Sequence, residues 1–72
     1  MTQPEVELAY NAGEIEFSDM VRELARCNAY NKLDTIDDIE GVLQGVLTKE
    51  TEEKVTALIK QTEEEDKNAK TN

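Results

Sequence analysis

The chain has 72 residues, in which 17 acidic side chains outnumber 8 basic ones and leave a net charge of −9. This length allows one small domain with a modest core, and the charge disfavours direct binding to nucleic acid because the phosphates would be repelled. Histidine is absent and Cys27 is the single cysteine, which excludes an internal disulfide, the usual zinc sites and the Cys/His or Ser/His nucleophile pairs.

The composition therefore predicts no cofactor, no metal and no enzymatic activity. Carboxylates are plentiful, but paired-acid catalysis needs a shaped, partly dry cleft that a core of this size can hardly provide. No apolar run approaches the ~20 residues of a membrane span, and the N-terminus lacks a secretory pattern. We expect a cytoplasmic protein with no membrane partner.

Residues 4–17 have two interpretations. Apolar and acidic side chains alternate on both sides of residues 11–13, which favours a β-hairpin with Glu5, Glu7, Glu14 and Glu16 on one face. The alternative is a short helix with Pro4 near its start and Gly13 just past its end. Residues 1–3 are expected to be flexible.

A helix is predicted next, from Ser18 to Tyr30. Ser18 is the candidate N-cap, and four residues form an inward stripe: Met20, Val21, Leu24 and Cys27. On that stripe, Cys27 is interpreted as a small core residue.

The stretch from Asp34 to Leu47 has the most consistent helical pattern, and we expect the rest of the chain to be arranged around it. Its apolar side chains share one helical side: Ile36, Ile39, Leu43, Val46 and Leu47. Thr35 is the predicted N-cap, with Asp38 in a capping-box-like position. Gly45 could instead end the helix and leave residues 46–47 in the connection.

A last helix is predicted after Thr48 or Thr51 as N-cap, with Val55, Leu58 and Ile59 facing inward. Residues 63–72 are expected to form an acidic, polar and largely disordered tail, so that residues 4–62 make up the single domain. The acid-to-base pairs Glu63 with Lys67 and Asp66 with Lys70 could instead extend a solvated helix by a turn or two. The predicted fold is mainly α, a small bundle of about three helices with an N-terminal β-hairpin (α+β). An all-α fold is the alternative.

The charge is unevenly distributed. Residues 1–48 carry ten acids and three bases, a net charge of −7, whereas residues 49–72 carry seven and five, a net charge of −2. Such a surface is attracted to basic surfaces, including those that normally hold DNA or RNA. The candidate partner-binding residues are Glu5, Glu7, Tyr10, Glu14 and Glu16, and an ordinary solvated face is the alternative interpretation.

In size, acidity and a compact helical core with an N-terminal segment of ambiguous structure, the whole chain resembles the small phage-encoded proteins that bind and inhibit bacterial RNA polymerase. This resemblance implies a transcription regulator in the host cytoplasm that hinders initiation or sigma-factor engagement by steric and electrostatic occlusion. Two other classes remain open. One is a DNA mimic or antitoxin-like inhibitor of a nucleic-acid-binding enzyme, and the other is a small oligomeric assembly subunit, although a monomer is expected.

Overall fold

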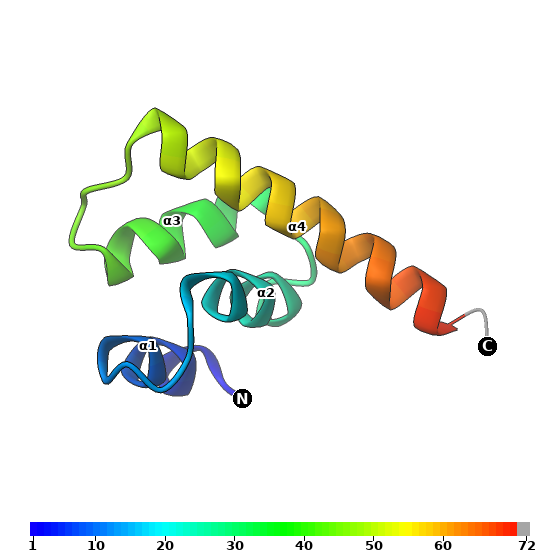
Figure 1. Ribbon diagram of the computed structural model, residues 1–72, viewed down its shortest axis with the longest axis horizontal. Coiled ribbons are helices and arrows are strands. Elements are labelled where there is room, and N and C mark those ends of the chain that lie inside the picture. The colour runs from blue at the N-terminus through cyan, green and yellow to red at the C-terminus, as the bar shows by residue number, and fades with distance from the viewer. Residues whose placement is uncertain (71–72) are drawn as a thin grey trace.

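The computed structural model describes residues 1–70, with side chains to residue 68, and its secondary structure is entirely helical over that range. The elements are α1 (Gln3–Asn11), α2 (Phe17–Cys27), α3 (Lys32–Val42) and α4 (Lys49–Lys70) (Figure 1). The all-α alternative is therefore confirmed. The predicted N-terminal β-hairpin is wrong, because no strand occurs in the described part of the chain.

Residues 4–17 form a helix because the side chains that reach the core follow a helical spacing. Val6 and Ala9, three positions apart, are buried, whereas Leu8 is 70% exposed. Pro4 stands in the first turn, where its missing N–H costs nothing. Gly13 follows the end of α1 at φ +78°, a conformation that glycine adopts without a steric penalty. The alternating pattern favoured a hairpin because it placed Leu8, and not Ala9, among the inward residues.

The first three helices end in the same way. In each, the second residue beyond the C-cap donates its N–H to a carbonyl five positions back: Glu14 to Ala9 (2.9 Å), Tyr30 to Ala25 (2.8 Å) and Gly45 to Glu40 (2.7 Å). The residue between has a positive φ: Gly13 at 78°, Ala29 at 52° and Gln44 at 58°. This is the Schellman motif, which satisfies the last carbonyls of a helix and reverses the chain.

The molecule is arranged around α2, and not around residues 34–47 as expected from the sequence. α2 packs against each of the other three helices (Figure 1). Its inward side chains at positions 20, 21, 24 and 25 are completely buried and lie at the centre of the core. The predicted stripe is correct for Met20, Val21 and Leu24. Cys27 is exposed, so its prediction as a core residue is wrong, and Ala25 takes the buried place.

Two predicted N-caps are wrong, Ser18 by two residues and Thr35 by four. α2 begins at Phe17 with Glu16 as N-cap, so Ser18 lies inside the helix. α3 begins at Lys32, and its N-cap Asn31 accepts a hydrogen bond from the Asp34 N–H (3.5 Å). Thr35 lies inside α3, where it is buried and donates its hydroxyl to the Asn31 carbonyl (2.9 Å).

α3 ends before residues 46 and 47, as the alternative interpretation had it, but Gln44 and not Gly45 is the first residue beyond its C-cap. The helix ends at Val42, so Val46 and Leu47 lie in the connection to α4. Leu47 packs against the core, while Val46 is 66% exposed. Asp38 forms no capping box. Instead it accepts a hydrogen bond from the Asn28 side-chain amide (2.6 Å), which ties the end of α2 to α3.

Thr48 is the N-cap of α4, since its hydroxyl accepts the Thr51 N–H (3.2 Å) and its carbonyl accepts the Glu52 N–H (2.9 Å). Val55 and Ile59 are buried and Leu58 is half-buried, as predicted. The helix then continues to Lys70, so residues 63–70, for which a disordered tail was expected, are helical; residues 71–72 lie outside the described part. Thr62 is fully buried on this extension.

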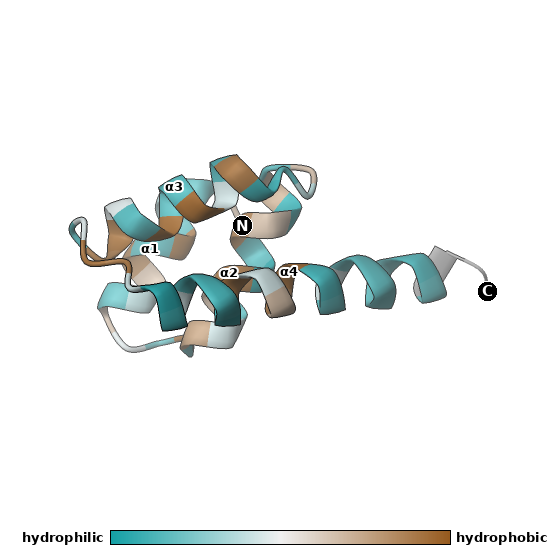
Figure 2. Cartoon of the chain, turned by 90° about the horizontal axis from the view of Figure 1, so that it is seen from above, coloured by the Kyte–Doolittle hydropathy of each residue, from teal (hydrophilic) through white to brown (hydrophobic). Residues whose placement is uncertain are grey.

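The C-terminal part of α4 extends beyond the other helices and is almost entirely polar (Figure 2). The principal extents of 38 × 25 × 17 Å reflect this projecting helix. Within residues 1–70, no helix combines the length and the apolar character that crossing a bilayer requires.

Candidate partner-binding surface

The structure separates the four glutamates that a hairpin would have placed on one face. We call Glu5, Glu7, Glu14 and Glu16 the N-terminal carboxylates. Two positions along a helix correspond to about 200° of rotation, so Glu5 and Glu7 point to different sides of α1. Glu14 lies in the connection after α1, and Glu16 is the N-cap of α2. All four are exposed, and none has an ion-pair partner among the described residues.

Tyr10, the fifth predicted site residue, lies in an aromatic and apolar environment. It is half-buried and its ring makes an edge-to-face contact with Phe17, with centroids 6.3 Å apart and planes at 66°. Both rings line an open hollow of about 370 Å³ together with Leu43, Thr51 and Lys54. We call it the aromatic hollow. All four helices or their ends contribute to its wall, and the four lining residues other than Lys54 are half-buried.

A second group of exposed carboxylates lies on α3 and was not among the predicted site residues. Asp34, Asp37 and Glu40 form what we call the acidic α3 face, on the side away from the buried Ile39. Leu33 lies among them and is 74% exposed. Helical periodicity could have found this face from the sequence, because positions 34, 37 and 40 are three residues apart, close to the 3.6-residue repeat.

Both arginines within residues 1–48 form ion pairs with acids of α4. Arg22 pairs with Glu65 (3.6 Å), and Arg26 pairs with both Asp66 (3.6 Å) and Glu23 (3.1 Å). Residues 1–48 contain three basic side chains, so only Lys32 lacks an ion pair there. Folding therefore uses the C-terminal acids to neutralise the arginines, and leaves the N-terminal carboxylates and the acidic α3 face without ion pairs to the part of the chain that the structure describes.

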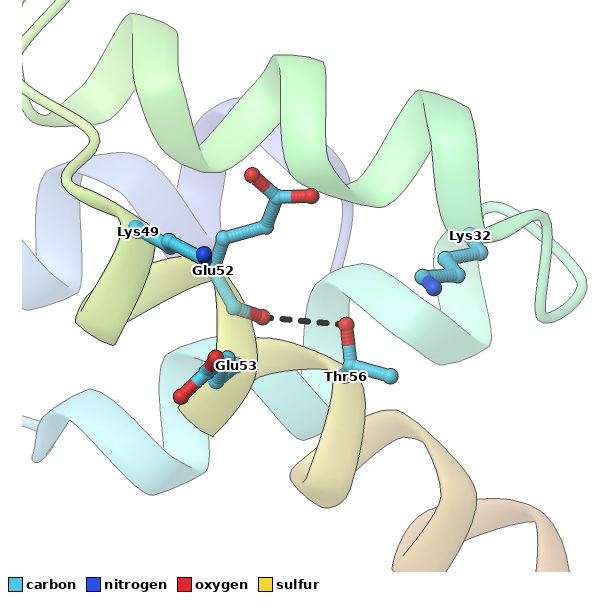
Figure 3. A pocket seen from close by; sticks show the side chains of 5 residues that line it. All are labelled: Lys32, Lys49, Glu52, Glu53 and Thr56. Atoms are coloured by element: carbon cyan, nitrogen blue, oxygen red, sulfur yellow. Dashed lines mark hydrogen bonds between the residues drawn. The ribbon is translucent and has the colours of Figure 1, made fainter.

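A second hollow lies elsewhere, between the start of α3 and the first turns of α4. It has a volume of about 530 Å³ and is lined by Lys32, Lys49, Glu52, Glu53 and Thr56 (Figure 3). The Glu52 side chain points toward α3, and the Thr56 hydroxyl donates to the Glu52 carbonyl (3.0 Å). The lining is polar and of mixed charge, unlike the mainly apolar surface of most small-molecule sites.

Within residues 1–70, no three His, Cys, Asp or Glu side chains gather in an arrangement that could hold a metal ion. Comparisons with protein-family models, with curated proteins and with solved structures find no match to this chain. The functional interpretation therefore depends on the surface of the molecule itself.

Proposed function

We propose that this protein is a non-catalytic regulator that binds a basic surface of a larger protein through its exposed carboxylates. One observation carries the proposal: residues 1–48 have a net charge of −7, while their two arginines are already paired with side chains of α2 and α4. The remaining carboxylates on α1, on the connection to α2 and on α3 form no ion pair with the described residues. Their charge is thus available to an external cation.

The first partner to test is bacterial RNA polymerase, because the chain resembles phage-encoded inhibitors of that enzyme in size, acidity and helical character. Surfaces that normally hold nucleic acid are strongly basic, so they attract a compact acidic protein. The protein would inhibit initiation by occupying such a surface, and no bond would be made or broken. A DNA mimic uses the same attraction, but it must then compete directly with duplex DNA for its target.

The test is the association rate of the intact protein with purified RNA polymerase, measured at low and at high salt. Reversing the four N-terminal carboxylates to lysine should slow association by about tenfold or more and flatten its salt dependence, since charge acts mainly on the on-rate. In vitro transcription should be inhibited by the wild type, and correspondingly less by the reversed variant. Excess duplex DNA should compete only if the DNA-mimic class is correct.

The control is a second variant with the same net charge as the variant reversed at the N-terminal carboxylates. Four exposed acids of α4 that have no ion-pair partner within the described residues are reversed instead: Glu50, Glu53, Glu63 and Glu64. Either set of reversals changes the net charge from −9 to −1. If only the total charge matters, both variants should lose association equally. If the docking surface lies within residues 1–48, the α4 variant should keep most of its association rate. No binding of the wild type at low salt would reject the polymerase as the partner.

A further inference from the structure

We propose that the aromatic hollow receives one large apolar side chain from the basic partner, and so anchors a complex that the carboxylates only steer. This inference rests on the proposed function and deepens it. Charged groups at an exposed surface raise the association rate, but they contribute little to the lifetime of a complex. Lifetime comes from a few apolar side chains that enter desolvated pockets near the centre of the contact.

The aromatic hollow has the surface that such an anchor needs. Tyr10, Phe17 and Leu43 supply its apolar wall, and each keeps part of its surface open to solvent after packing against the core. Its volume of about 370 Å³ lies at the low end of the ~300–1,000 Å³ range of ligand pockets, which suits a side chain better than a cofactor. Aromatic side chains also lose little entropy on binding, because their rings have few rotatable bonds.

The charge of the molecule selects the chemistry of the occupant. Lys54 is the single charged residue of the wall, and it has no ion pair among the described residues. An amphipathic anion would gain from that one lysine, but it must approach a protein of net charge −9. A lysine- or arginine-rich segment is attracted by the same field, and Glu16 directly precedes Phe17 of the wall. The occupant is therefore an apolar side chain flanked by basic ones.

The exposed leucines elsewhere do not offer the same fit. Leu8 and Leu33 are 70% and 74% exposed, and neither lines the aromatic hollow or the hollow of Figure 3. A single protruding leucine buries little surface against a partner, whereas a side chain in the aromatic hollow is in contact on several sides. Leu33 on α3 is thus the matched control for Leu43 in the wall.

The experiment uses two short lysine-rich peptides that differ only at the central residue, tryptophan in one and serine in the other. Because this protein contains no tryptophan, the emission of the peptide reports its own burial directly. At low salt the tryptophan peptide should bind about tenfold more tightly than the serine peptide, with a blue-shifted emission. Backbone amide shifts of the labelled protein should centre on residues 10, 17, 43 and 51.

Variants then locate the binding site. Leu43→Ala should remove most of the preference for tryptophan, while Leu33→Ala should leave it intact. Since Leu43 also packs against the core, Thr51→Phe is the second variant, which fills the hollow from α4 without removing an apolar core side chain. Lys54→Ala should tighten binding of the basic peptide severalfold, because it removes the only cation of the wall.

Each remaining outcome contradicts a different statement. Equal binding of both peptides overturns the hollow and leaves the electrostatic docking in place, whereas no binding of either peptide at low salt overturns both proposals. Loss of the tryptophan preference in Leu33→Ala, but not in Leu43→Ala, moves the anchor to α3 and rejects the hollow. If phenylbutyrate binds there and Lys54→Ala abolishes that binding while the basic peptide ignores the hollow, the site belongs to amphipathic anions.

Discussion

At the scale of single residues, the backbone of this protein carries strain at two helix ends. Ala29 and Gln44 have φ values of 52° and 58° at the position that glycine occupies after α1. An L-residue in this conformation costs roughly 1–2 kcal/mol, because its Cβ crowds the following carbonyl. The capping bonds of Tyr30 to Ala25 and Gly45 to Glu40 hold these residues in place, since they satisfy carbonyls that would otherwise lack a partner.

Glycine at either strained position should therefore stabilise the fold. The relief of strain exceeds the ~0.5–1 kcal/mol that the greater freedom of glycine costs in the unfolded chain, so we expect Ala29→Gly and Gln44→Gly each to raise the free energy of unfolding by about 0.5–1 kcal/mol. Urea denaturation followed by circular dichroism measures this change.

Two variants of the α1 end serve as controls. Gly13→Ala should destabilise by about 1 kcal/mol through backbone strain alone, because an added Cβ meets nothing within 4 Å. Ala12→Gly should also destabilise, since Ala12 has φ −80° and gains nothing from glycine. A destabilised Ala29→Gly variant would show that residue 29 does not adopt the left-handed conformation in solution.

At the scale of the elements, the sequence of α1 is compatible with two periodicities, that of a strand and that of a helix. A strand would bury Val6 and Leu8 together, whereas the helix buries Val6 and exposes Leu8. Nothing local decides between them, because the segment has both an alternating pattern and good helix-end residues. Packing against α2 decides it, since only the helix brings Val6, Ala9 and Tyr10 to that neighbour at the same time.

This difference gives a direct test of α1. Val6→Ala should lower the free energy of unfolding by about 1.5–3 kcal/mol, because it removes two buried methyl groups and leaves a cavity. Leu8→Ala should change stability by no more than about 0.5 kcal/mol, as expected at an exposed helical position. Comparable losses in both variants, measured by thermal or urea denaturation, would favour the hairpin.

The extension of α4 is the second element whose structure depends on its neighbours. Beyond Ile59 the buried side chain among the described residues is Thr62, and ion pairs with Arg22 and Arg26 join the extension to α2. Exposed ion pairs contribute only about 0–1 kcal/mol and are screened by salt. In addition, Nε of Arg22 is buried without an acceptor among the described residues. The extension should therefore be the least stable part of the helix.

Hydrogen exchange can measure this local stability. Added salt should accelerate amide exchange at residues 63–68 severalfold, and Arg26→Gln should do the same without salt. Exchange at residues 55–59, which are held by the core, should change little, and Lys60→Gln is the control because Lys60 forms no ion pair in the described part. Unchanged exchange at residues 63–68 in both conditions would mean that the ion pairs do not hold the helix.

At the scale of the whole molecule, the dominant property is the excess of negative charge on a small core. A net charge of −9 on 72 residues repels itself and opposes compaction, while the core can offset only a modest free-energy cost. The same excess is what the proposed function uses. A basic partner would relieve the repulsion on binding and thereby stabilise the fold.

Added salt should therefore stabilise the whole fold while it destabilises the C-terminal extension of α4. Moderate sodium chloride should raise the midpoint of thermal unfolding by a few degrees, because a change of about 1 kcal/mol corresponds to ~4–8 °C in a domain of this size. The variant with Glu50, Glu53, Glu63 and Glu64 changed to lysine should respond less, since its net charge is −1. A midpoint that falls with salt in the wild type would mean that ion pairs outweigh self-repulsion.

The sequence by itself determined most of the helical stripes of α2 and α4, a threonine cap at position 48 or 51, the helix-compatible ends of α1 and the concentration of acids before residue 49. These features depend on residue type and spacing along a few turns, so local chemistry is enough to predict them. Only the tertiary structure decided that α1 is a helix, that α2 is central, that Cys27 is exposed and that residues 63–70 continue α4. It also brought Tyr10, Phe17 and Leu43 to one hollow and set Arg22 and Arg26 against α4. Each of these depends on which surfaces pack together, and packing joins residues that lie far apart in the chain.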